Sequence, residues 1–217
     1  MTGGFSCGYK TSVGSNGTVW AAISRQGVVA LAGARAVTLK PRLPVLPQDV
    51  EEASEALEAI GRGRSFVVVH PGSTDVRRCW PAERFAKVAD FCAAELGLAV
   101  VLTGVAREAE PVARVRGAMR HEAIDLCGRL SLPGMVGLLS QAALVVTNNT
   151  GPLHLALAVG SRAVGLFWAE QAINTLPLFR ERFRPLIAWD RHCPLCGKYV
   201  DKTEFDRRRP YPCAHRA

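Results

Sequence analysis

Residues 143–160 limit the possible fold more than any other stretch, because a short polar turn joins an apolar strand to an apolar helix there. Residues 144–147 are apolar and rich in β-branched side chains, which is typical of a strand covered on both faces in a parallel sheet. Pro152 suits the first turn of the following helix, where its missing N–H costs nothing. The stretch therefore predicts a strand–turn–helix unit of a parallel sheet.

The turn of this unit carries groups that hold anions. Asn149 or Thr150 can cap the helix, and Gly151 allows a ligand to approach the backbone closely. Free N–H groups and the positive end of the helix dipole then face the space beyond the strand, and His154 can reach the same crevice. The alternative is a well-capped helix without a ligand, with His154 in an ordinary structural contact.

Strand and helix patterns alternate from about residue 65 onward. Such alternation predicts an α/β fold, a Rossmann-like parallel sheet with helices on both faces. The strands are expected at 66–69, 99–102, 124–126, 144–147 and 163–167, and the helices at 49–60, 81–96, 108–119 and 133–141.

The chain divides into three parts by composition. Residues 1–47 are rich in Gly, Ser and Thr and do not resemble a complete domain, although residues 28–31 and 36–39 could form short strands. Residues 48–190 form the regular domain, and residues 191–217 form a basic tail that contains Cys and His.

The loop at residues 70–81 follows the first strand of the regular domain, and ligands of such sheets bind where strands end. Gly72 and Ser73 offer donors there, and Arg77 or Arg78 can neutralise a diphosphate with a planar guanidinium. The alternative is a surface loop with solvated arginines.

The second strand is followed by Thr103, Gly104 and Glu108. By analogy with dinucleotide-binding folds, a tight turn and a carboxylate at this place suit ribose hydroxyls. The alternative is that Glu108 only complements the dipole of the helix that it opens.

In chain order these pieces resemble the C-terminal half of glycosyltransferase family 9, the ADP-heptose lipopolysaccharide heptosyltransferases and their relatives, which have the GT-B fold. The resemblance covers roughly residues 60 to 190. It rests on His70-Pro-Gly-Ser, Arg78-Cys-Trp-Pro, Phe85, Leu102-Thr-Gly, Leu126-Cys-Gly-Arg-Leu-Ser-Leu and Asn148-Asn-Thr-Gly-Pro-Leu-His-Leu-Ala.

The resemblance implies transfer of a sugar, typically heptose, from a nucleotide-diphosphate donor to a glycan or lipopolysaccharide-like acceptor, with inversion at the anomeric carbon. It implies a donor site in this domain, with Arg78 and His154 in catalytic roles. We expect that transfer requires no cofactor, because protein cations and helix N–H groups can take the electrostatic role of a metal ion. Together with Gly72, Thr103 and Gly104, the donor-binding residues that it implies are Ser73, Arg78, Glu108, Leu130, Asn149, Thr150, Gly151 and His154.

Two departures from the family pattern define the first alternative function. Asn149 stands where family members generally have Asp, and residues 1–60 show no counterpart of the acceptor-binding domain with its general base. The alternative is a truncated, catalytically inactive nucleotide-sugar-binding module, or a chain whose partner supplies the acceptor domain.

The tail holds Cys193, Cys196, Cys213 and His215, a set that could bind a structural zinc ion. Reduced cysteines without a ligand, or a redox-active pair, are the alternatives. With the arginines at 207–209, the tail also suggests a second alternative function, a zinc-ribbon protein that binds nucleic acid, although the leading hypothesis expects no nucleic acid.

The net charge of +8 favours anionic partners. No apolar run approaches the roughly 18 residues of a membrane helix, and the first residues do not resemble a signal peptide. We therefore expect a cytoplasmic protein, either free or peripheral to the inner face of the membrane.

Overall fold

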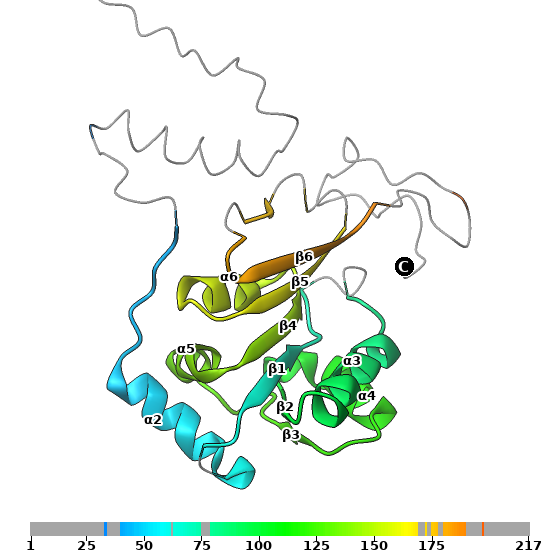
Figure 1. The fold of residues 1–217 in the computed structure, drawn as a ribbon, viewed down its shortest axis with the longest axis horizontal. Coiled ribbons are helices and arrows are strands. Elements are labelled where there is room, and N and C mark those ends of the chain that lie inside the picture. The colour runs from blue at the N-terminus through cyan, green and yellow to red at the C-terminus, as the bar shows by residue number, and fades with distance from the viewer. Residues whose placement is uncertain are drawn as a thin grey trace, which may run out of the picture.

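The computed structural model describes residues 33, 40–61, 63–74, 79–168, 172, 175–177, 180–189 and 197. They form a six-stranded sheet in the order β3-β2-β1-β4-β5-β6, in which all neighbouring strands are parallel (Figure 1). The predicted fold class is confirmed. The strands are β1 (Phe66–His70), β2 (Ala99–Leu102), β3 (Ala123–Asp125), β4 (Leu144–Asn148), β5 (Ala163–Trp168) and β6 (Phe183–Ala188).

Helices connect the strands from β1 to β5, as is usual for parallel strands. The predicted helix at 49–60 is α2 followed by a short 3-10 helix, and the predicted helix at 108–119 likewise begins with a 3-10 turn. The helices are α2 (Pro47–Ala56), η1 (Glu58–Ile60), α3 (Ala82–Ala94), η3 (Ala106–Glu108), α4 (Ala109–Ala118), α5 (Leu132–Gln141) and α6 (Gly151–Ala158).

Each face of the sheet has its own apolar core. Successive side chains of a strand point to opposite faces. Val67 and Val69 of β1 therefore pack in a cluster with Phe85 of α3, whereas Val68 packs with Leu139 of α5. As a result, α3 and α4 cover one face of the sheet, and α2, α5 and α6 cover the other (Figure 1).

α2 packs directly on α5 and holds the start of that helix. The Glu52 carboxylate accepts hydrogen bonds from the N–H of Ser131, at 2.7 Å, and from its hydroxyl, at 2.5 Å. These bonds lower the pKa of Glu52. A Cβ at Gly137 would lie 1.9 Å from the carbonyl oxygen of Asp49, so a glycine is required for the two helices to approach this closely.

The edge strand β6 was not predicted. Pro185 interrupts its sequence, and a proline within an apolar run argues against a strand. β6 pairs only with β5 among the described strands, and an edge strand can tolerate a residue without an N–H. The order of the strands therefore explains why Pro185 is accepted here.

Several predictions for the ends of the chain concern residues outside the described ranges, namely the short strands at 28–31 and 36–39 and the Cys/His set of the tail. In the part of the chain that is described, no helix has the length and apolar character that a membrane span requires.

Candidate functional site

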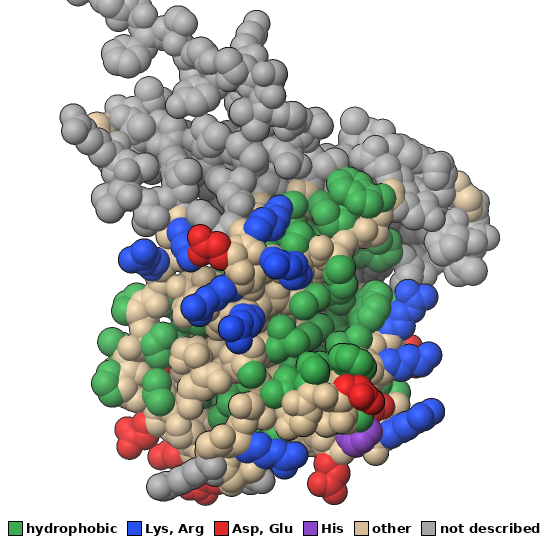
Figure 2. All heavy atoms as spheres, viewed as in Figure 1, with side chains coloured by type: hydrophobic (Ala, Val, Ile, Leu, Met, Phe, Trp, Pro, Cys, Tyr) green, Lys and Arg blue, Asp and Glu red, His purple; other side chains and the backbone are tan. Residues whose placement is uncertain are grey.

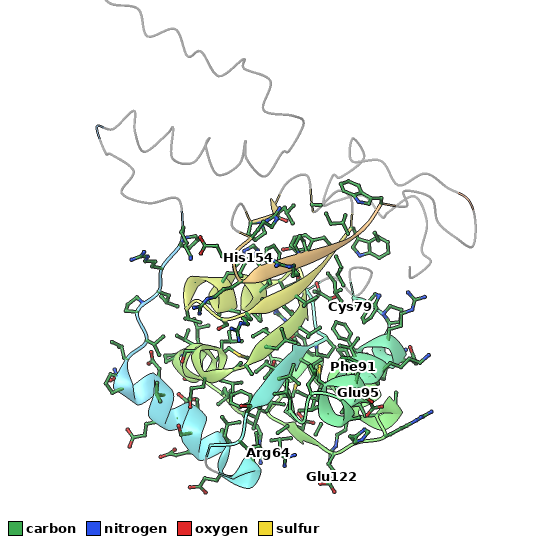
Figure 3. All side chains as sticks on the ribbon, viewed as in Figure 1. Arg64, Cys79, Phe91, Glu95, Glu122 and His154 are labelled. Carbon is green, nitrogen blue, oxygen red and sulfur yellow. The ribbon has the colours of Figure 1, made fainter. Side chains whose placement is uncertain are left out.

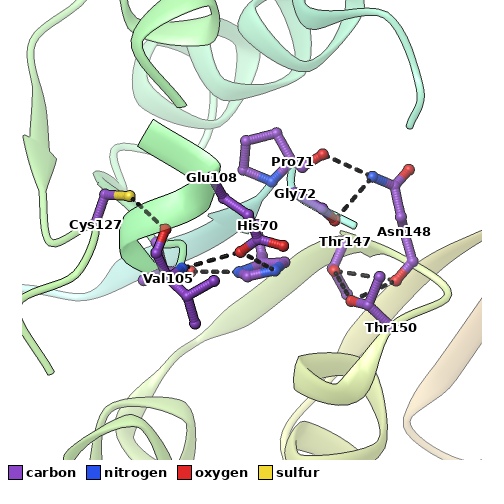
Figure 4. Close-up of polar contacts among 10 residues, drawn as sticks. His70, Pro71, Gly72, Val105, Glu108, Cys127, Thr147, Asn148 and Thr150 are labelled. Carbon is purple, nitrogen blue, oxygen red and sulfur yellow. Dashed lines mark hydrogen bonds and ion pairs between the residues drawn. The ribbon is translucent and has the colours of Figure 1, made fainter. Parts of the chain in front are cut away.

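The carboxyl ends of β1 and β2 meet in a buried polar network (Figure 4). Nδ1 of His70 lies 3.2 Å from the hydroxyl oxygen of Thr103, and its Nε2 lies 3.6 Å from a carboxylate oxygen of Glu108. All three residues are buried. In the tautomer with the proton on Nε2, Nδ1 accepts from Thr103 while the ring N–H faces the carboxylate.

Glu108 joins two loops of the candidate site. Its carboxylate accepts the N–H of Val105 at 2.9 Å and thereby closes the turn after β2. It also lies against Gly72, where an added Cβ would come within 2.4 Å of the carboxyl carbon. A side chain at position 72 would therefore force the Glu108 carboxylate away from the loop after β1.

Burial lowers the pKa of His70, and the nearby Glu108 carboxylate opposes this effect only in part. His70 therefore stays neutral at neutral pH and acts as a hydrogen-bonding group. Since His70 is 3% exposed and Thr103 is 0% exposed, their side chains form the floor of the site and not its open surface.

Asn148, the last residue of β4, joins Pro71 to Trp80 through its side-chain amide. Its Nδ2 donates to the carbonyl oxygen of Pro71 at 2.8 Å (Figure 4). Its Oδ1 accepts the N–H of Trp80 at 3.1 Å. Asn148 is 2% exposed, so these bonds satisfy a buried amide. Sequence analysis did not assign this role, although a polar residue at the end of a buried strand could have indicated it.

The start of α6 is open, as an anion site needs. Thr150 is the N-cap residue, but its side chain makes no capping bond, contrary to the predicted cap. Its hydroxyl instead lies 3.3 Å from the Thr147 hydroxyl and 3.3 Å from the Asn148 carbonyl oxygen (Figure 4). Gly151 is exposed, and a Cβ there would meet nothing within 4 Å. The helix start can therefore receive a ligand at its N–H groups.

Asn149 lies beside this opening. Its Nδ2 donates to the Thr175 hydroxyl at 2.6 Å. Its Oδ1 is buried and has no hydrogen-bond partner among the described residues. A buried acceptor without a partner is uncommon, and a ligand hydroxyl could satisfy it.

The structure brings most of the predicted donor-binding residues to the same edge of the sheet. Ser73 and Leu130 are half-buried, Gly104 is buried below the turn after β2, and His154 is exposed on α6 (Figure 3). Arg77 and Arg78 lie outside the described residues, as do Cys193, Cys196, Cys213 and His215. Among the described residues, no three His, Cys, Asp or Glu side chains are grouped so as to hold a metal ion.

Comparison with known proteins matches residues 23–202 to the model of glycosyltransferase family 9 (heptosyltransferase). The chain is 32% identical over 149 residues to lipooligosaccharide heptosyltransferase 2 of Haemophilus influenzae, a match that covers 64% of this chain and 42% of the relative. It is 31% identical over 125 residues to lipopolysaccharide heptosyltransferase 3 of Escherichia coli K12, over 56% of this chain and 36% of the relative. The chain thus spans less than half the length of these relatives.

Solved structures show the same fold. A glycosyl transferase of family 9 from Veillonella parvula matches with a TM-score of 0.67 and 24% identity, over 75% of this chain and 47% of that one. The E. coli ADP-heptose lps heptosyltransferase II matches with a TM-score of 0.60 and 24% identity, over 70% of this chain and 47% of that one.

Proposed function

The chain belongs to glycosyltransferase family 9, the heptosyltransferases, and from this premise we propose that it binds a nucleotide-diphosphate sugar of the ADP-heptose kind and takes part in transferring the sugar to a lipopolysaccharide-like acceptor. The observation that carries the proposal is the open N-terminus of α6, which faces the same edge of the sheet as the glycine loop after β1. This arrangement suits an anionic diphosphate.

In the proposed reaction, the acceptor hydroxyl oxygen bonds to the anomeric carbon as the bond from that carbon to the diphosphate oxygen breaks. The diphosphate leaves with the electron pair, and inversion follows from attack on the opposite face. Backbone N–H groups at Thr150 and Gly151, together with Arg78, stabilise the charge that develops on the leaving group. The transfer therefore needs no metal ion.

Asn149 and His154 orient the sugar in this proposal, and Ser73 holds a phosphate oxygen. The Oδ1 of Asn149, which has no hydrogen-bond partner among the described residues, supports its role, because this oxygen can accept a hydrogen bond from a sugar hydroxyl. The proton of the attacking hydroxyl must go to a general base. We assign that base to an acceptor-binding part of the enzyme, in this protein or in a partner chain.

Calorimetric titration with ADP, GDP, UDP and ADP-heptose tests the donor site. One nucleotide should bind, and zinc chelation should leave its affinity unchanged. Removal of a charged hydrogen bond in Arg78→Ala should weaken binding by about 10-fold to 100-fold. The matched control is Arg64→Ala, because Arg64 is exposed before β1, at the opposite edge of the sheet (Figure 3).

Absence of nucleotide binding by the folded protein, or equal losses in both variants, would contradict the donor site. Nucleotide binding without sugar transfer to a lipopolysaccharide acceptor would instead identify a donor-binding module. A turnover assay on the same preparation separates these two outcomes.

A further inference from the structure

A group of cationic side chains lies outside the candidate site, at the amino-terminal ends of β5 and β6. Figure 2 shows Lys and Arg side chains gathered around one carboxylate on this face of the molecule. The six cations and Glu181 give the group a net charge of +5. This basic patch consists of Lys40, Arg42, Arg162, Arg180, Arg182 and Arg184.

The segment before α2 brings two of these cations to the patch. The N–H of Leu43 donates to the carbonyl oxygen of Ala158 at 3.1 Å, which fixes the segment to the end of α6. Nζ of Lys40 lies 3.2 Å from a carboxylate oxygen of Glu181, just before β6. Residues that are far apart in the sequence therefore contribute to one surface.

The pairing of β5 with β6 places the remaining arginines side by side. The N–H of Ala163, next to Arg162, donates to the carbonyl oxygen of Arg182 at 2.8 Å. Arg184 lies opposite Val164 in the register and donates to the carbonyl oxygen of Arg180 at 2.7 Å. These arginines are all exposed, and Glu181 is the only acidic residue in the described sequence from 180 to 189.

Apolar side chains border the basic patch. Leu43 is 36% exposed and Leu46 is 46% exposed in the segment before α2, and Leu186 is 57% exposed two residues beyond Arg184 on β6. Cations next to exposed aliphatic side chains are typical of surfaces that contact lipid headgroups and the adjoining acyl region.

We propose that the basic patch docks on an anionic phospholipid surface. This inference rests on the proposed function, because a glycolipid acceptor is presented at a membrane. The patch lies at the amino edge of the sheet and the donor site at the carboxyl edge, separated by strands that rise about 3.3 Å per residue. Docking therefore leaves the donor site open.

The same surface is less suited to nucleic acid. Proteins that bind single strands stack bases on exposed aromatic side chains. Phe183, between Arg182 and Arg184, is 1% exposed, and the exposed Trp189 follows the carboxyl end of β6, away from the basic patch. A phospholipid surface requires only charge and aliphatic contact.

Co-sedimentation of the full chain with vesicles tests the inference without any donor or acceptor. Binding should require phosphatidylglycerol in phosphatidylethanolamine vesicles and should fall as salt is added. Each cation near such a surface contributes about fivefold, so Arg42→Gln/Arg162→Gln should lower the partition coefficient roughly 25-fold. The control is Lys87→Gln/Arg120→Gln, because these exposed cations lie on or beside α3 and α4, which connect β1, β2 and β3 at the other end of the strand order from β5 and β6.

Four results would overturn the inference. The first two are equal binding to neutral vesicles and equal losses of binding in the patch and control variants. The others are loss of binding only when the arginines at 207–209 are replaced by glutamine, and preference for duplex DNA over phosphatidylglycerol vesicles. The vesicle assay contains no nucleotide. A lack of vesicle binding would therefore contradict the docking inference and leave the calorimetric test of the donor site unaffected.

Discussion

The two edges of the parallel sheet use polar side chains in opposite ways. At the carboxyl edge, His70, Thr103 and Asn148 are each at most 3% exposed, and each has a hydrogen-bond partner in a neighbouring strand or loop. At the amino edge, the arginines of the basic patch are exposed. One edge is built for fixed geometry, and the other presents charge to its surroundings.

The difference has an energetic meaning. A buried polar group that loses its partner costs about 1–3 kcal/mol, whereas most exposed charges contribute 0–1 kcal/mol to stability. Substitutions at the carboxyl edge should therefore change the free energy of unfolding. Substitutions at the amino edge should change interactions with partners and leave the fold unaffected.

In the comparison of the two edges, the largest expected effect follows from Gly72→Ala, which would place a methyl group 2.4 Å from the carboxyl carbon of Glu108. Overpacking of this kind should reduce the free energy of unfolding in urea by about 1–3 kcal/mol. Gly151→Ala is the matched control, because a Cβ there meets nothing within 4 Å.

A double-mutant cycle identifies the cause of the Gly72→Ala effect. Glu108→Ala removes the carboxylate against which the methyl group would press, so adding Gly72→Ala to Glu108→Ala should cost little more. Additive losses would show that the contact between Gly72 and Glu108 is not responsible, and the carboxyl edge would then be less tightly packed than its geometry indicates.

Sequence periodicity was enough to predict the sheet and most of its helices. Residues 99–102 form a strand with the predicted bounds, because a short apolar run between turn residues leaves few alternatives. β6 could not be predicted in the same way, since Pro185 is compatible with a strand only at the edge of a sheet, and edge position depends on the tertiary fold.

The candidate site was predictable only as a set of loops. The polar residues that follow β1, β2 and β4 could be placed at one edge, because parallel strands end together. Their partners could not be predicted. Thr103 contacts His70, and Asn148 joins Pro71 to Trp80. These pairings depend on strand register and side-chain direction, which no local pattern encodes.

The next expected effect concerns pH. Burial lowers the pKa of His70 from its ordinary value of 6.5, so below pH 6.5 the unfolded chain takes up a proton that the folded chain resists. The contribution to stability is complete above pH 6.5 and is lost as the pH falls from 6.5 to the folded pKa. The slope reaches at most about 1.4 kcal/mol per pH unit.

Urea unfolding at a series of pH values measures this contribution as the difference between the wild type and His70→Gln, which has no imidazole to titrate. His121→Gln is the control, because His121 is exposed and pairs with Asp90 at 3.0 Å on the protein surface. If the slope below pH 6.5 persists in His70→Gln, the buried network at the carboxyl edge is not its source.

The smallest expected effect is at the amino edge. Arg42→Gln/Arg162→Gln should change the free energy of unfolding by less than about 0.5 kcal/mol, because exposed side chains away from caps and buried networks rarely contribute more. Their removal should slightly relieve repulsion among the cations of the basic patch, so any stabilisation should shrink as salt is added. Urea unfolding at low and high salt measures both effects. A large, salt-independent loss would show that these arginines support the fold, and the contrast between the two edges would then rest on burial at the carboxyl edge alone.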